Sequence, residues 1–302
     1  MASVSRWWIK LVVVLGLVIP LTAEAKPRLL ASIKPLALIA QEVAGDRAIV
    51  DTLLPISASP HDYPLKMSDH RRLRSADLVV WIGPELESFL SRPLSGLNKN
   101  RVLTTYELPD LYWPEQTEDI DGHHHTSHQH IGKDPHIWLD PRNAVVIALA
   151  IAAGLTALDP DGKQEYQLNS ARFNASIQQM DQQIGLQLAA VKSTGFAVYH
   201  EGYSHFVSRY GLHQVGYVTY APERRPGAKH LKELRDVLRK EGSCLFIEPY
   251  YQVASIESMA KSIGLKVGVL DPIGDQQVSS YQTLIEKLAN SFSSCLADVT
   301  DR

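Results

Sequence analysis

The chain has 302 residues, which is enough for two domains. With 45% hydrophobic and 21% charged residues, it has the composition of an ordinary globular protein with material for a sizeable core. Its formal net charge of −3 argues against the basic surface that is typical of nucleic-acid binding, so we expect no nucleic-acid partner.

Residues 1–25 have the pattern of a secretory signal peptide. Arg6 and Lys10 precede the apolar run Leu11–Leu21, and Ala23-Glu24-Ala25 supplies an Ala-x-Ala cleavage site. The run is too short for a comfortable membrane span. Cleavage removes two of the 30 basic and one of the 33 acidic residues, which leaves 28 and 32 and a net charge of −4. Because no cysteine stands near the cleavage site, we expect a soluble periplasmic protein rather than a lipoprotein.

Short runs of strand character then alternate with helical patterns in a first block. The expected strands are Arg28–Ile33, Ile49–Leu54, Leu78–Ile82 and Arg101–Thr104, and the expected helices are Leu36–Ala44, Ser68–Ser75 and Glu85–Ser91. An Ala/Val/Ile-rich stretch, Ala144–Leu158, is expected to be a buried helix, with Asp140 as N-cap and Pro141 at its first position. We assign this block to an N-terminal α/β lobe, residues 26–161.

A second alternating block follows. The expected strands are Phe196–Tyr199, Gln214–Val218, Cys244–Ile247 and Lys266–Leu270, and the expected helices are Ala228–Lys240, Ser255–Ser262 and Tyr281–Phe292. Strand–helix alternation in two blocks predicts two α/β lobes of (β/α)4 type, each with a mostly parallel sheet. The C-terminal lobe covers residues 193–302.

Between the two blocks the pattern predicts one long rigid helix over residues 162–192. One apolar stripe recurs there at steps of three or four residues: Phe173, Ile177, Met180, Ile184, Leu188 and Val191. About thirty residues at 1.5 Å each would span roughly 45 Å, long enough to brace both lobes. A coiled-coil arm is the alternative, but the stripe covers too few heptads to favour it.

A histidine-rich tract precedes the buried helix. Half of the chain's 12 histidines fall between His123 and His136. Such tracts are typical of metal binding, because neutral imidazole is a good ligand for zinc and later first-row metals. The alternative is a polar loop in which the histidines are incidental. We expect an accessory metal-binding loop at 121–130, made of His123, His124, His125, His128 and His130.

Four further residues lie just past apolar runs or in turn-rich loops. They are His61, His136, His200 and Asp271. In parallel α/β sheets, ligands collect beyond the carboxyl ends of the strands, so we expect these side chains in the cleft between the lobes. Three His and one Asp form the four-coordinate set that zinc prefers, whereas manganese would favour more oxygen.

Three other features bear on this site. Glu248 ends a predicted strand, where it either orients a ligand histidine or caps the following helix. His205 is either an accessory ligand or a packed or surface histidine. The only two cysteines are Cys244 and Cys295, and in an oxidising compartment we expect them to be paired.

The chain also resembles a known family, the zinc-uptake branch of the metal-binding substrate-binding proteins of ABC transporters, from about Ala31 to Leu296. The supporting segments include Ala31-Ser32-Ile33-Lys34-Pro35, His61-Asp62-Tyr63-Pro64-Leu65, His136-Ile137-Trp138-Leu139-Asp140-Pro141, Val198-Tyr199-His200-Glu201, Phe246-Ile247-Glu248-Pro249 and Leu270-Asp271-Pro272-Ile273-Gly274. Their occurrence together in this order is a specific signal.

The resemblance implies two lobes joined by one helix, a metal ion held by His61, His136 and His200, and a His-rich loop before the second ligand. In manganese relatives a carboxylate usually stands where this chain has His200, which favours zinc. Some zinc members have Glu just before the first ligand, where this chain has Pro60. Asp271 or a water must therefore complete the ligand set, and we expect Asp271. The resemblance also supports the disulfide.

The function that follows is capture of Zn²⁺ in the periplasm and its delivery, by a monomer, to an inner-membrane ABC permease and its ATPase. A manganese- or iron-binding protein of the same transporter class is the nearest alternative. A secreted zinc hydrolase is the alternative from another class, but His200 and His205 are five residues apart, whereas a zincin needs His-Glu-x-x-His. We therefore expect no enzymatic activity.

Overall fold

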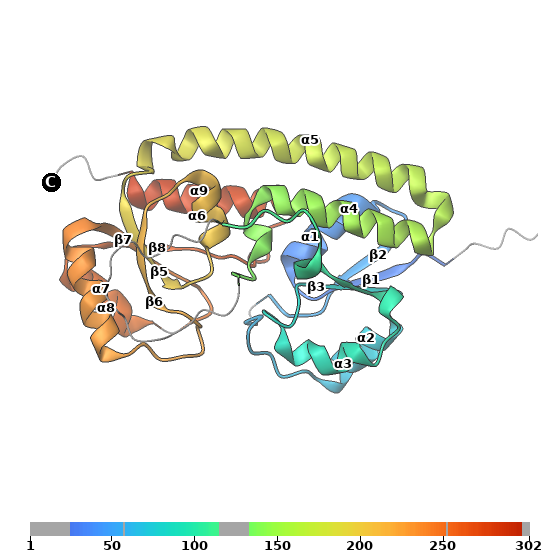
Figure 1. Cartoon of the computed structure of the whole chain (residues 1–302), viewed down its shortest axis with the longest axis horizontal. Coiled ribbons are helices and arrows are strands. Elements are labelled where there is room, and N and C mark those ends of the chain that lie inside the picture. Colours follow the sequence, from blue (N-terminus) through green and yellow to red (C-terminus); the bar gives the residue numbers. More distant parts are fainter. Residues whose placement is uncertain (1–24, 57, 115–132, 252, 298–302) are drawn as a thin grey trace, which may run out of the picture.

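The computed structural model describes residues 25–56, 58–114, 133–251 and 253–297, which form two α/β lobes under one long helix (Figure 1). The expected signal peptide lies outside the described residues, apart from Ala25. So do the five histidines between His123 and His130.

The N-terminal lobe is built on a four-stranded parallel sheet. Its strands are β1 (Arg28–Ala31), β2 (Ile49–Thr52), β3 (Leu78–Trp81) and β4 (Val102–Thr104), in the order β2-β1-β3-β4. Its helices include α1 (Lys34–Ala44), α2 (Met67–Ser75) and the short α3 (Ser91–Ser95). The helix predicted at Glu85–Ser91 is wrong in position: a 3-10 turn covers Ser88–Leu90 and α3 starts at Ser91. Pro93 explains the shift, because proline fits the first turn of a helix.

The C-terminal lobe repeats this architecture. Its strands are β5 (Gly195–His200), β6 (Gln214–Thr219), β7 (Gly242–Ile247) and β8 (Lys266–Val269), in the order β6-β5-β7-β8 and all parallel. Its helices include α7 (Ala228–Glu241), α8 (Ala254–Ser262) and α9 (Tyr281–Leu296). The prediction of two parallel α/β lobes is confirmed.

A short helix of the second lobe, α6 (Ser204–Tyr210), was not predicted. It has seven residues and no side-chain cap at its start, so local sequence signals for it are weak. Tertiary contacts hold it instead, since Phe206 and Tyr210 are buried in the core. It ends at Gly211, whose left-handed φ of 64° is the usual way to stop a helix.

The helix that follows His136 is long and apolar. α4 (Pro141–Leu158) is capped by the Asp140 side chain, which accepts from the backbone N–H of Arg142, as predicted. By length and composition α4 is apolar enough to cross a membrane, the one such helix in the described part of the chain. It packs on α1 and α5 with Ile147, Ile151 and Leu155 buried, which is the placement of a core helix.

The helix α5 (Lys163–Leu188) joins the lobes, as predicted. Its 26 residues correspond to about 39 Å, and it lies along both lobes (Figure 1). It packs on α1 and α4 at one end and on α9 at the other. Its buried Asp181 pairs with Arg209 and accepts from the Tyr210 hydroxyl (3.0 Å), which fastens it to α6. One cluster of buried apolar residues includes members of both lobes and of α5.

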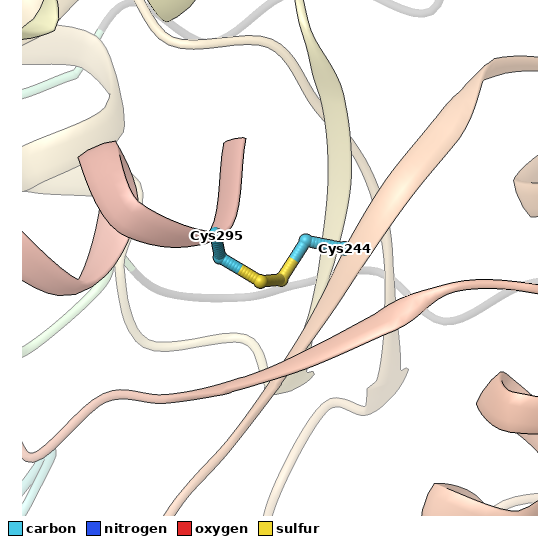
Figure 2. The surroundings of a disulfide bond; sticks show 2 residues. All are labelled: Cys244 and Cys295. Atoms are coloured by element: carbon cyan, nitrogen blue, oxygen red, sulfur yellow. A yellow bond between two sulfur atoms is a disulfide. The ribbon is translucent and has the colours of Figure 1, made fainter. Parts of the chain in front are cut away.

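The predicted disulfide between Cys244 and Cys295 is confirmed. It joins β7 to α9, with a Cα–Cα distance of 6.1 Å (Figure 2). The two cysteines are 51 residues apart. In the chain-entropy model, closing a loop of this size contributes roughly 4 kcal/mol. The bond therefore fixes the last helix, on which α5 rests, to the sheet that carries His200.

Candidate metal centre

Three histidine side chains from distant parts of the sequence converge at one point between the lobes. One ring nitrogen from each of His61, His136 and His200 lies within 4.8 Å of the other two. The Nε2 atom of His136 is 3.2 Å from that of His61 and 3.3 Å from that of His200. A tetrahedral ion with bonds of about 2.05 Å would separate two ligand nitrogens by roughly 3.3 Å. The spacing therefore fits a single small cation.

The elements that carry these histidines explain the convergence. His61 lies in the loop between β2 and α2, and His136 directly precedes the 3-10 turn Ile137–Leu139 that leads into α4. Both belong to the N-terminal lobe. His200 is the last residue of β5, in the C-terminal lobe. The cluster therefore contains side chains from both lobes.

Two of the three imidazoles are held by carboxylates through their other nitrogen. The Nδ1 of His136 is 2.6 Å from Asp134 Oδ1, and the Nδ1 of His200 contacts Glu248 Oε1. Glu248 follows β7, the neighbour of β5 in the sheet, so the strand ends bring the pair together. It orients a histidine, one of the two roles considered for it above. When Nδ1–H donates to a carboxylate, Nε2 is left as a lone-pair donor, which is the tautomer a metal needs.

The electrostatics of the site fit a cation. Burial, together with the neighbouring His136 and His200, holds the pKa of His61 well below its ordinary value of 6.5. Burial also acts to lower the pKa of His200, but Glu248 outweighs it and the pKa is raised. Burial would raise the pKa of Asp134, yet its contact with His136 leaves that pKa lowered. Carboxylates thus lie on the Nδ1 side of His136 and His200, while the Nε2 atoms of the two rings face each other, an arrangement that suits a cation between the rings.

Asp271, the fourth predicted ligand, is not part of the close group formed by the three histidines. It lies two residues beyond β8. Its Oδ1 accepts from the Tyr250 hydroxyl and from the backbone N–H groups of Ile273 (3.1 Å) and Gly274 (2.7 Å). In this structure the side chain therefore stabilises the turn after β8.

Gly202 lies against the histidine cluster and was not singled out from the sequence. A Cβ atom there would lie 2.3 Å from Nε2 of His200 and 2.9 Å from Cε1 of His136. Any other residue would displace the two rings, because the backbone here lies too close to them to leave room for a Cβ atom. The one available signal was a glycine two residues after a strand end, where glycine permits close backbone approach.

Asp134 was also missed, although it stands two residues before His136 in the sequence. Its role depends on contacts through space that no spacing rule gives. His205 is a packed histidine: it is 1% exposed, its Nε2 is 3.0 Å from the carbonyl oxygen of Asp134, and its ring centroid is 5.5 Å from that of Trp113.

The fold and the cluster together define a class. Two parallel α/β lobes, one long connecting helix and a group of metal-ligating side chains between the lobes are the features of a two-lobed metal-binding protein. Residues 29–295 match the family described as the zinc-uptake complex component A, periplasmic (ZnuA). The chain belongs to this family.

Individual relatives agree with the assignment. The high-affinity zinc uptake system protein ZnuA of Yersinia pestis is 36% identical over 292 residues, which cover 90% of this chain and 92% of the relative. The protein of the same description from Haemophilus influenzae is 34% identical over 324 residues, covering 92% and 95%. A crystal structure of a ZnuA deletion mutant with bound zinc superimposes with a TM-score of 0.77 at 26% identity, covering 90% of this chain and 98% of that one.

Proposed function

We propose that this protein captures Zn²⁺ in the periplasm and delivers it to an ABC permease driven by a separate ATPase. The observation that carries the proposal is the convergence of three Nε2 atoms from opposite lobes at spacings of 3.2 and 3.3 Å. Family membership and the zinc-uptake description of the relatives support it.

The proposed ligands are His61, His136 and His200, with Asp271 as the fourth. Asp271 would join by a rearrangement at the turn after β8. A set dominated by imidazole nitrogen favours zinc, whereas manganese favours carboxylate and carbonyl oxygen. The tract His123–His130 is proposed to bind zinc weakly and to supply the cleft.

The organisation proposed for the chain follows from this function. A signal peptide at 1–25 would direct export without lipid attachment. The lobes 26–161 and 193–302 would each supply ligands to the ion, and the helical segment 162–192 would connect them within a monomer. The family description as a periplasmic component supports this placement.

We propose binding rather than catalysis as the activity. A zinc hydrolase keeps one coordination position open for water, and general-base groups must reach it. Asp134 and Glu248 are instead engaged with the Nδ1 atoms of ligand histidines. His200 ends a strand and His205 lies in α6, so the two do not form the chelating pair of a zincin helix.

The test is calorimetric titration of metal-stripped mature protein with Zn²⁺ and, separately, Mn²⁺. We expect one tight zinc site that disappears when His61, His136 and His200 are all changed to Ala, and much weaker manganese binding. Transport is tested by zinc-limited growth of cells that lack the chromosomal copy and express either form. Equal growth with the triple variant, or tight zinc binding that survives it, would reject the proposal.

A further inference from the structure

We propose that Asp134 is a positioning residue that couples the orientation of the ligand His136 to the contact between the lobes, through Ser204. The inference rests on the proposed function, because it concerns the same metal site. It assigns a role to two residues that are not among the proposed ligands.

Asp134 uses both of its carboxylate oxygens, one towards each lobe. Oδ1 accepts from the ring Nδ1 of His136 at 2.6 Å and from the backbone N–H of the same residue at 3.0 Å. Oδ2 accepts from the hydroxyl of Ser204 at 2.5 Å and from its backbone N–H at 3.2 Å. One rigid carboxylate therefore connects a ligand of the N-terminal lobe to the first residue of α6 in the C-terminal lobe.

The sequence positions of these partners make the link direct. Asp134 precedes the ligand His136 by two residues, and Ser204 follows the ligand His200 by four. A change in the spacing of the lobes that lengthens the Asp134–Ser204 contact must also release or rotate the carboxylate. The His136 imidazole then loses the acceptor that fixes its tautomer and ring plane.

The surroundings keep this carboxylate in place. The Asp134 side chain is only 12% exposed, so its hydrogen bonds are shielded from water. The carbonyl oxygen of Asp134 lies 3.0 Å from Nε2 of the buried His205, which fixes the backbone to the same helix α6. These contacts limit how far Asp134 can adjust when the lobes move.

Glu248 shows what a carboxylate does without such a link. It contacts His200 from the neighbouring strand end of the same lobe. It can orient its histidine, but this contact lies within the C-terminal lobe and so does not depend on the spacing of the lobes. By reciprocity, an ion that favours the Asp134-held position of His136 must strengthen the contact between the lobes by the same factor.

The test is a double-mutant cycle on the full mature chain, read out as the zinc dissociation constant in competition with a chromophoric chelator. We expect Asp134→Asn to weaken binding about 10- to 100-fold. Ser204→Ala should weaken it roughly 3- to 10-fold, because the loss of one hydrogen bond to a charged group acts on the site through Asp134. Ser204→Ala should add little to Asp134→Asn in the double variant, since both act through one carboxylate.

Controls separate positioning from general damage. Ser208→Ala removes an exposed hydroxyl one turn further along α6 and should leave binding within about twofold. Ser204→Thr keeps the hydroxyl and should restore affinity. The visible spectrum of the Co²⁺-loaded protein should shift in Asp134→Asn and in Ser204→Ala but not in Ser208→Ala.

The outcomes are distinct. Wild-type affinity in Ser204→Ala, or effects of the two substitutions that simply multiply, would overturn the coupling while leaving the zinc site intact. Failure of the wild-type protein to bind zinc would instead reject the proposed function. If Asp134→Asn does not fold, the zinc affinities of Ser204→Ala, Ser208→Ala and Ser204→Thr still show whether the Ser204 hydroxyl acts on the metal site.

Discussion

The two lobes share one architecture but present their histidines differently. His200 is the last residue of β5, is 2% exposed, and contacts Glu248 through its Nδ1 atom. His61 lies in a loop, is only partly buried, and has its backbone N–H on Ser59 Oγ at 3.2 Å, while its ring contacts the other two histidines. His200 is therefore held by a strand and a carboxylate, as His136 is held by Asp134, whereas His61 is held by its loop and by contacts with the other two rings.

The largest expected effect is the loss of zinc affinity when either of these two histidines is removed. Either His200→Ala or His61→Ala should weaken zinc binding on the order of 1,000-fold, about 4 kcal/mol, because each removes a proposed ligand. Only His200→Ala should also lower the stability of the metal-free protein, by roughly 1–3 kcal/mol, because it leaves the buried Glu248 without its partner. Denaturant unfolding of the metal-stripped variants checks the difference. Equal stability in the two variants would show that the contact between His200 and Glu248 does not stabilise the metal-free protein.

The next effect concerns Glu248. Glu248→Gln keeps the shape of the side chain but removes its charge, and we expect a 10- to 100-fold loss of zinc affinity. Burial lowers the pKa of His200 and Glu248 raises it, with a net rise, so protons compete with zinc as the pH falls through that raised pKa. In the variant the pKa of His200 should fall below 6.5, and proton competition should begin at lower pH. NMR titration of the metal-free imidazole measures this shift, and an unchanged pKa would count against it.

A smaller effect tests the fourth ligand. Asp271→Asn keeps an oxygen for the N–H groups of Ile273 and Gly274 but removes the charge, so we expect about a tenfold loss of zinc affinity if the carboxylate ligates. Tyr250→Phe is the matched control, since it removes a hydrogen bond to the same oxygen without changing the charge. Full affinity in Asp271→Asn would assign the fourth position to water.

The smallest effect on zinc binding concerns Glu87, a buried acid of the N-terminal lobe. Glu87 is fully buried in the N-terminal lobe, accepts from the backbone N–H of Ile82 at 2.8 Å, and burial raises its pKa from 4.5 to about 7. Between pH 4.5 and pH 7, Glu87 is protonated in the native state and ionised in the unfolded state. The stability present below pH 4.5 is therefore lost progressively as the pH rises through 7.

Glu87→Gln should remove that loss and raise the stability at pH 8 by up to about 3 kcal/mol, with little change in zinc affinity. Unfolding at pH 5.5 and pH 8 provides the measurement. The exposed Glu85→Gln is the control and should behave as wild type. A variant that keeps the wild-type dependence on pH would show that Glu87 is not the group responsible.

The sequence could predict the parts that depend on periodicity and on the ends of elements. Alternating runs located both sheets, the stripe from Phe173 to Leu188 located α5, and Asp140-Pro141 located the start of α4. His61, His136 and His200 were predicted to meet because parallel strands deliver their carboxyl ends to a common edge. With only two cysteines in the chain, the disulfide had one possible pairing.

What the sequence could not provide depends on distances through space. Asp134 matters because its second oxygen reaches Ser204, 70 residues away. Gly202 matters because two imidazoles occupy the place of its missing side chain. The helix α6 forms because Phe206 and Tyr210 find a core, which overrides its weak local signals.

A crystal structure of the zinc-loaded protein, with anomalous scattering recorded across the zinc edge, tests the central idea most directly. We expect one strong peak between the lobes, with the Nε2 atoms of His61, His136 and His200 each about 2.0–2.1 Å away. A zinc peak bound by other side chains, with any of these three nitrogens outside bonding distance, would show that the three histidines do not form the zinc site.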